Sequence, residues 1–206
     1  MNLNLGFLAS HDGSNVKAIM ESIEQGRLRA SPKVIISNNP NSGVLELAKN
    51  KNIPHYCLNE KNFPQKYKSL DLAIIKTLQE HQVNLVVLAG YMKKVGSQLL
   101  EAYHNRILNI HPSLLPKHGG KGLYGLKVHQ AVLDYGDTEA GVTIHLANQE
   151  YDQGRILAQA KIKVLPNDTA DSLASRVLKL EHALYSQTLI EIQTNRLDLD
   201  NYVNIM

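Results

Sequence analysis

The chain has 206 residues, of which 43% are hydrophobic and 20% charged, and its formal net charge is +3 at pH 7. These values are ordinary for one folded domain, and the small, mixed excess of positive charge is far from a nucleic-acid-binding footprint. The single cysteine, Cys57, excludes an internal disulfide, and no segment approaches the roughly 20 apolar residues that cross a bilayer. We therefore expect a cytoplasmic protein, a monomer or weak homodimer, with no nucleic-acid or membrane partner.

Apolar bursts alternate with amphipathic stretches along the first half of the chain. This pattern predicts strands at 3–10, 32–39, 53–59, 84–91 and 106–113, and helices at 15–26, 43–52 and about 64–81. Continuous apolar strands that alternate with helices are typical of a parallel sheet covered on both faces.

The pattern changes after about residue 138. Long strands at 140–147 and 155–165 are joined by a short polar loop, which predicts an antiparallel pair, and 167–192 reads as one long helix with Asp168 or Thr169 as its cap. We therefore predict an α/β fold with a doubly wound, mostly parallel, Rossmann-like sheet, an antiparallel C-terminal strand pair and a long C-terminal helix. A single domain would cover 1–195, followed by a tail at 196–206.

In doubly wound sheets, ligands bind beyond the carboxyl ends of the strands. The first strand is followed by Gly13, Ser14 and Asn15, which open the first helix. Free backbone N–H groups and the helix dipole would favour a phosphate there. A simple turn in which Ser14 or Asn15 caps the helix explains the same residues, so both interpretations stay open. The stretch is neither a dinucleotide nor a nucleoside-triphosphate motif.

The sequence N-I-H-P-S at 109–113 ends a predicted central strand. Side chains at i and i+2 point to the same face, so Asn109 and His111 face together, while Pro112 ends the strand. An amide and an imidazole aimed at one point could stabilise an oxyanion. Asp152, in the loop between the late strands, could raise the pKa of His111 and keep it charged near neutral pH. The alternatives are strand-end side chains in local hydrogen bonds and a turn aspartate.

Two other chemistries fit the sequence poorly. A hydrolase built from Ser113, His111 and Asp152 lacks the G-x-S-x-G elbow, and Ser113 lies beside its own base. A metal site built from His111, His118 and His129 has no recognised ligand spacing. We therefore expect no metal.

Several ordered motifs together indicate a family. They are G-S-N at 13–15, L-A-G-Y-M at 88–92, L-N-I-H-P-S-L-L-P at 108–116, G-V-T-I-H-L at 141–146, Y-D-Q-G-R-I-L-A-Q at 151–159 and E-H-A-L-Y at 181–185. In their order and spacing the chain resembles the phosphoribosylglycinamide formyltransferase family of folate-dependent enzymes over residues 3 to about 192.

The resemblance implies a role for each matching residue. Asn109, His111 and Asp152 fall on the catalytic positions, and Gly13, Ser14 and Asn15 on the substrate-phosphate loop. Glu181 matches the residue that holds the ribose hydroxyls, with Lys179 close by. The folate pocket is implied to involve Met92, Lys93, Lys94, Val95, Asn109, Asn148, Gln149, Glu150, Tyr151 and Asp152. Residues 1 to about 105 would bind the substrate phosphate, and about 106–195 would carry catalysis and folate binding.

The implied reaction transfers the formyl group of the co-substrate 10-formyltetrahydrofolate to the amine of glycinamide ribonucleotide, in de novo purine biosynthesis. Asn109 and protonated His111 would stabilise the tetrahedral oxyanion, and Asp152 would help to move the proton. The alternatives are formyltetrahydrofolate deformylase, methionyl-tRNA formyltransferase, a formyltransferase for a related amine, and a binding module that uses only the phosphate turn. Deformylase carries a regulatory domain ahead of the core, and the tRNA enzyme a C-terminal RNA-binding domain. We expect neither, because the first strand begins at about residue 3 and the last helix ends near 192.

The sequence departs from the family pattern in three places. The loop K-H-G-G-K-G-L-Y-G at 117–125 is long, and its Lys117 and Lys121 could close over an anionic substrate unless it is a solvated surface loop. Gln149 stands where an acidic residue is common. Tyr67 stands near a position where relatives often have a basic residue that contacts a ligand, and Lys66 or Lys68 could substitute for that residue.

Overall fold

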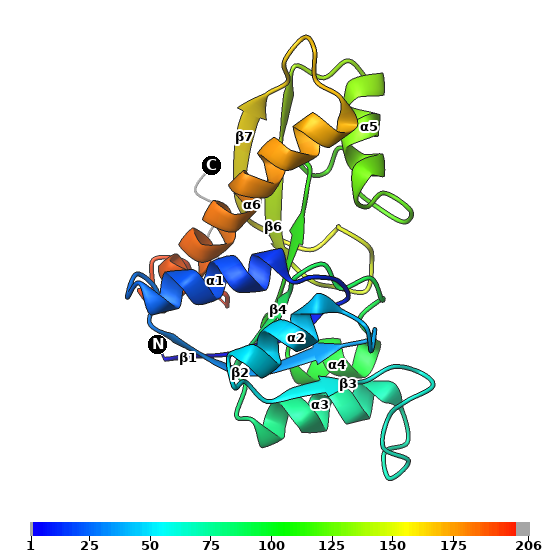
Figure 1. Ribbon diagram of the computed structural model, residues 1–206, viewed down its shortest axis with the longest axis vertical. Coiled ribbons are helices and arrows are strands. Elements are labelled where there is room, and N and C mark those ends of the chain that lie inside the picture. Colours follow the sequence, from blue (N-terminus) through cyan, green and yellow to red (C-terminus); the bar gives the residue numbers. More distant parts are fainter. Residues whose placement is uncertain (1, 201–206) are drawn as a thin grey trace.

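The computed structural model describes residues 2–200, and its seven strands form one sheet in the order β3-β2-β1-β4-β5-β6-β7 (Figure 1). The strands are β1 (Leu3–Ala9), β2 (Ala30–Ser37), β3 (His55–Cys57), β4 (Leu85–Leu88), β5 (Ile107–His111), β6 (Glu139–Leu146) and β7 (Ile156–Lys163). The first five are mutually parallel, whereas β6 and β7 pair antiparallel. The predicted fold class is confirmed.

Six helices cover the sheet: α1 (Ser14–Glu24), α2 (Gly43–Asn50), α3 (Leu70–Glu80), α4 (Ser97–Ala102), α5 (Leu126–Asp134) and α6 (Ala170–Gln193). Two separate hydrophobic clusters form, one that includes α1, α2, α5 and α6 and one that includes α3 and α4. Apolar strand residues are divided between the two clusters because successive side chains point to opposite faces of a sheet.

The sequence analysis missed α4 and α5 and placed the start of α3 too early. Helix α3 begins at Leu70 rather than near residue 64, because the Ser69 hydroxyl accepts from the backbone N–H of Leu72 and caps the helix there. Helix α4 has six residues, too few for a clear apolar periodicity.

The long helix α6 lies beside α1 and packs on β6 and β7 (Figure 1). Its start is fixed by a capping box between Thr169 and Ser172, which agrees with one of the two predicted caps. Farther along, the fully buried Tyr185 directs its hydroxyl at the carbonyl oxygens of Leu88 and Leu108, each at 3.0 Å. Helix α6 is thereby attached to the carboxyl end of β4 and to the first half of β5.

The predicted tail at 196–206 is partly packed. Leu199 is buried, and Arg106 donates to Asp200 across 2.8 Å. Residues 201–206 lie outside the described part of the chain. Between residues 2 and 200, no helix is long and apolar enough to cross a membrane.

Candidate functional site

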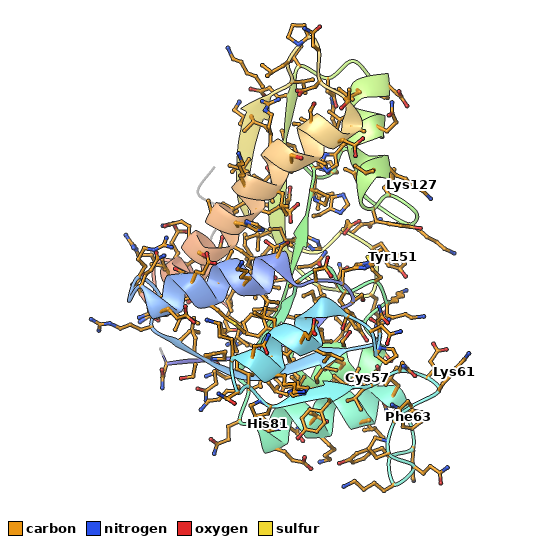
Figure 2. All side chains as sticks on the ribbon, in the orientation of Figure 1. Cys57, Lys61, Phe63, His81, Lys127 and Tyr151 are labelled. Carbon is orange, nitrogen blue, oxygen red and sulfur yellow. The ribbon has the colours of Figure 1, made fainter. Side chains whose placement is uncertain are left out.

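The residues predicted to bind ligands lie where parallel strands end. In the view of Figure 1 the carboxyl ends of β1, β2 and β3 lie to the right, and Tyr151 of the β6–β7 loop is on the same side (Figure 2). Strand β5 lies between parallel β4 and antiparallel β6, so β6 brings a second set of side chains to this edge.

Asn109 faces a histidine that the sequence analysis did not single out. In the β5–β6 register Asn109 is directly opposite His145, and its side-chain Nδ2 is 3.0 Å from His145 Nε2. His145 Nδ1 is 2.9 Å from the carbonyl oxygen of Leu146. Because a carbonyl can only accept, Nδ1 of His145 carries a proton, and Nε2 is placed to accept from the Asn109 amide. One N–H of the Asn109 amide is thus fixed, and the other is left for a ligand.

His111 is held in one tautomer by the loop that follows β5. Its Nε2 lies 2.9 Å from the carbonyl oxygen of His118, so Nε2 carries the proton. Its Nδ1 lies 3.4 Å from Oδ2 of Asp152. The nitrogen that can exchange a proton with a substrate is therefore Nδ1, which shares its surroundings with the Asp152 carboxylate.

The charge state expected for His111 is wrong. Burial lowers the pKa of His111 below its ordinary value, and the opposing effects of Asp152 and of the His118 carbonyl do not overcome it. The imidazole is only 5% exposed, so the loss of hydration exceeds the attraction of one carboxylate at 3.4 Å. His111 is therefore neutral at pH 7.

Asp152 is ionised and accepts one hydrogen bond, while the rings of His111 and His145 lie close to its two oxygens. Burial acts to raise its pKa, but the backbone N–H of Gly120, and His145 and His111 when they carry a proton toward it, lower the pKa below the ordinary value. Gly120 donates to Oδ2 across 2.9 Å, and His145 Nε2 lies 3.6 Å from Oδ1. Asp152 has a left-handed backbone, with φ of 57°, which is uncommon for a residue other than glycine. The structure thus places Asn109, His111 and Asp152 around one point, with His145 between the first and the last.

The glycine-rich loop at 117–125 approaches the site with its backbone rather than with its lysines. Lys117 pairs with Asp137 across 2.9 Å, and Lys121 is exposed. His118 and Gly120 instead contribute a carbonyl and an N–H to His111 and Asp152. The expected lid of lysines is replaced by main-chain contacts.

At the end of β1, Gly13 caps helix α1 without any side-chain capping bond. Its φ of 72° is left-handed, and a Cβ there would meet Val44 Cγ2 at 2.4 Å. Neither Ser14 nor Asn15 is the cap, because both lie inside the helix. The first-turn N–H groups have no partner within the helix, so the turn offers donors to an anion.

Glu181 of α6 reaches this turn. Asn15 Nδ2 donates to Glu181 Oε2 across 2.8 Å, and Asn15 Oδ1 is buried without a hydrogen-bond partner in the described structure. Burial raises the pKa of Glu181, and the bond from Asn15 opposes it only in part. Lys179 lies two residues earlier, about 200° around the helix, and is exposed, so the structure does not bring it together with Glu181.

A small cleft of about 80 Å³ opens beside Asn109 and Asp152. Of the residues predicted for the folate pocket, Met92 and Gln149 do not line it, while the other eight do: Lys93, Lys94, Val95, Asn109, Asn148, Glu150, Tyr151 and Asp152. Leu88, Tyr91, His145 and Ala147 also line it. Gln149 lines a neighbouring cleft on the other side of the loop.

A larger cleft of about 490 Å³ adjoins the small one and shares Tyr91, Lys93, Lys94 and Val95 with it. Lys61 adds a further positive charge to its lining. Neither Tyr67 nor its neighbours Lys66 and Lys68 line either cleft. Among residues 2–200, no group of three or more histidine, cysteine or acidic side chains could hold a metal ion.

His145, His118 and Gly120 are the site residues that the sequence analysis missed. His145 lies in the motif G-V-T-I-H-L. A residue-by-residue prediction of the pairing between β5 and β6 would have placed it opposite Asn109. No sequence signal identifies the His118 carbonyl or the Gly120 N–H, because every residue other than proline has both groups.

The chain is similar to known proteins over most of its length. Residues 3–189 match the formyl transferase family. The phosphoribosylglycinamide formyltransferase of Bacillus subtilis is 35% identical over 89% of this chain and 91% of its own length. A chloroplastic phosphoribosylglycinamide formyltransferase of Arabidopsis thaliana is 40% identical over 94% of this chain. The chain spans 66% of that relative and 59% of the chloroplastic enzyme of Vigna unguiculata.

Solved structures agree with these sequence relatives. Glycinamide ribonucleotide transformylase 1 of Symbiobacterium toebii has a TM-score of 0.86 and 35% identity, over 95% of this chain and 90% of its own. A formyltetrahydrofolate deformylase of Pseudomonas syringae has a TM-score of 0.83 at 23% identity, and covers 98% of this chain and 65% of its own. The second likeness shows the shared fold alone.

Proposed function

Because the chain belongs to the formyl transferase family, we propose that it transfers the formyl group of 10-formyltetrahydrofolate to the amine of glycinamide ribonucleotide, a step of de novo purine biosynthesis. The relatives named above support this choice of acceptor. The observation that carries the proposal is the convergence of Asn109, His111 and Asp152 beside a cleft at the carboxyl edge of the sheet. A module that only binds phosphate needs none of these three side chains.

We propose that the resting site receives a proton rather than donates one. The neutral Nδ1 of His111 and the ionised Asp152 face one another at 3.4 Å, and a proton that the attacking amine loses can be shared between them. His111 then carries a charge that Asp152 stabilises. With the free N–H of Asn109, its Nδ1–H can donate to the oxyanion of the tetrahedral intermediate. The same proton can pass to the departing folate nitrogen.

The two clefts support an elongated, anionic co-substrate, which supplies the formyl carbon. The small cleft alone, at about 80 Å³, is well below the roughly 300–1,000 Å³ of typical ligand sites, so its walls must part when a bicyclic ring enters. Lys94 Nζ lies 5.6 Å from the centroid of the Tyr151 ring, and both residues line the small cleft. Three lysines and two acidic residues line the larger cleft, and the excess of positive charge suits an acidic tail; they are Lys61, Lys93, Lys94, Glu60 and Asp71.

The amine substrate would occupy the other side of the site. Ser14 and Asn15 begin α1 with free N–H groups for the phosphate, and Glu181 with the unpartnered Asn15 Oδ1 suits the ribose hydroxyls. We propose that residues 1–105 hold the phosphate end and also supply Lys61, Lys93 and Lys94 to the folate clefts. Residues 106–195 would carry catalysis and the remaining folate contacts, with Glu181 as a contact to the ribose from this second part. Cys57, a free thiol, supports a reducing compartment such as the cytoplasm, although two relatives are named chloroplastic.

The test mixes purified protein, 10-formyltetrahydrofolate and glycinamide ribonucleotide and follows release of tetrahydrofolate. We expect release that depends on the amine and yields a formylated product by mass spectrometry. A reaction without the amine measures hydrolysis. Release at the same rate without the amine would overturn the transferase and favour a deformylase.

A further inference from the structure

Asp137, between α5 and β6, receives the side chains of two consecutive loop residues. Lys117 Nζ lies 2.9 Å from its Oδ1, and His118 Nε2 lies 2.6 Å from its Oδ2. Each carboxylate oxygen therefore has its own partner. The two contacts lower the pKa of Asp137, the bond from His118 most of all, so the carboxylate is ionised at neutral pH.

The same two residues turn their backbone carbonyls toward the site. The Lys117 carbonyl accepts from the Ser113 hydroxyl across 2.6 Å, and the His118 carbonyl accepts from His111 Nε2 across 2.9 Å. Ser113 and His111 are both almost completely buried. The carboxylate of Asp137 thus holds the side chains of Lys117 and His118, and the carbonyls of the same two residues accept hydrogen bonds from Ser113 and His111.

The backbone at His118 needs such an anchor. Its φ of 54° is left-handed, a conformation that costs energy for any residue with a Cβ and persists where the surroundings enforce it. Besides the bond to Asp137, the ring of His118 makes an edge contact with Tyr135, with centroids 5.8 Å apart. The next residues of the loop lead to the Gly120 N–H, which donates to Asp152.

We propose that Asp137 is a positioning residue for the reaction proposed above. By fixing the His118 peptide, it keeps the proton of neutral His111 on Nε2 and leaves Nδ1 open toward Asp152. Asp137 lines neither of the two clefts. Its removal frees the His118 peptide to rotate, and His111 then samples both tautomers, one of which carries a proton on Nδ1 and cannot accept one from the amine.

The first test measures the tautomer without any substrate, so it stands apart from the proposed function. In protein with ¹⁵N-labelled histidine, long-range ¹H–¹⁵N correlations distinguish the two ring nitrogens, and a His111→Gln variant assigns the His111 signals. At a pH where His111 is neutral, we expect a proton on Nε2 in the wild type and a mixture of tautomers in Asp137→Ala. Glu139→Gln is the matched control, since it removes a nearby carboxylate that pairs with Lys161 instead of the loop.

The second test measures turnover. We expect Asp137→Ala to lower kcat by about tenfold, as is typical when a group that orients a functional histidine is lost, with little change in either KM. Glu139→Gln should leave both unchanged. If Asp137→Ala fails to fold by circular dichroism, His118→Phe is measured instead, because it keeps a ring beside Tyr135 and loses the bond to Asp137.

A variant whose His111 keeps its proton on Nε2 and whose kcat equals that of the wild type overturns the proposal. A proton fixed on Nε2 in the wild type and a mixture of tautomers in Asp137→Ala, together with no transferase activity in the wild type, would instead preserve the positioning role and reject the proposed reaction. If the His111 tautomer changes in Asp137→Ala but kcat does not, then Asp137 sets the tautomer without an effect on catalysis, and the proposed positioning role in the reaction is rejected.

Discussion

The carboxylate of Asp152 lies 3.4 Å from Nδ1 of His111, and both side chains are nearly sealed from solvent. Asp152→Asn keeps the shape of this side chain but removes the charge that stabilises protonated His111. We expect kcat to fall by roughly 10²–10³-fold, the scale seen when one group that stabilises an oxyanion is lost, while the fold is retained. Steady-state kinetics and a thermal melt check this. The matched control is Asp134→Asn, which makes the same change on a residue that bonds to Gln130. Near wild-type turnover in Asp152→Asn would reject the mechanism.

We expect His145 to affect turnover by orienting the side chain of Asn109. In His145→Leu the Asn109 amide loses the acceptor 3.0 Å away that fixes its orientation, so its free N–H is no longer aimed. We expect kcat to fall by about fivefold, since a hydrogen bond of this kind contributes about 1 kcal/mol. In an Asn109→Ala background the same change should have a smaller effect, because only the contact between His145 and Asp152 is then left to lose. Equal losses in both backgrounds would show that His145 acts by another route.

The residues of this site illustrate what the sequence can and cannot predict. Asn109 and His111 were found because strand alternation places i and i+2 on one face, and Asp152 because it lies in a short polar loop between two strands. His145 depends on the register of β6 against β5, and His118 on the path of a loop, neither of which periodicity determines. The charge of His111 was predicted wrongly because burial, which dominates its pKa, depends on the folded packing.

The same division holds for the fold. The apolar strands and α6 were predictable, because each has a long, periodic or continuous pattern. Helices α4 and α5 were missed, and α5 follows directly on the glycine-rich loop, with Gly125 at its N-cap. Met92 and Lys179 match positions that have a ligand role in the family, but both side chains are exposed. Met92 does not line the small cleft, and Lys179 does not lie beside Glu181.

Acid should destabilise the protein partly through His129. This side chain is 4% exposed, its Nδ1 has no hydrogen-bond partner in the described structure, and burial lowers its pKa, with His111 adding to the effect. The unfolded chain titrates near 6.5, so at lower pH it binds more protons than the folded one. The stabilising contribution is present above about pH 6.5 and is lost as pH falls through the lower, folded value.

We therefore expect the free energy of unfolding to fall between about pH 7 and pH 5, and to fall less in His129→Leu. Urea titrations at several pH values measure both slopes. His111 and His182 have lowered pKa values and act in the same direction, so the variant keeps part of the slope. Glu181, whose pKa is raised, acts in the opposite direction in both proteins. Equal slopes would mean that His129 does not contribute.

Gly13 should be intolerant of any side chain. Gly13→Ala places a Cβ 2.4 Å from Val44 at a φ of 72°, so it combines a steric clash with a strained backbone. Gly26→Ala is the matched control, because Gly26 has a φ of 70° and open space around it. We expect Gly26→Ala to cost about 1–2 kcal/mol of stability, and Gly13→Ala to cost more and to weaken binding of glycinamide ribonucleotide. Denaturant titration and calorimetry measure these, and equal effects would place the phosphate elsewhere.

Tyr185 and Glu181 stand about one turn apart on α6, and the Tyr185 hydroxyl is fastened to the carbonyls of Leu88 and Leu108. The carboxylate that we propose for the ribose is therefore held at a fixed distance from β4 and from β5, the strand that carries Asn109 and His111. In the proposed reaction, helix α6 sets the distance between the ribose and the amine of the substrate. An analogue with one more methylene between ribose and nitrogen would then bind at both ends but place its amine beyond the reacting carbon.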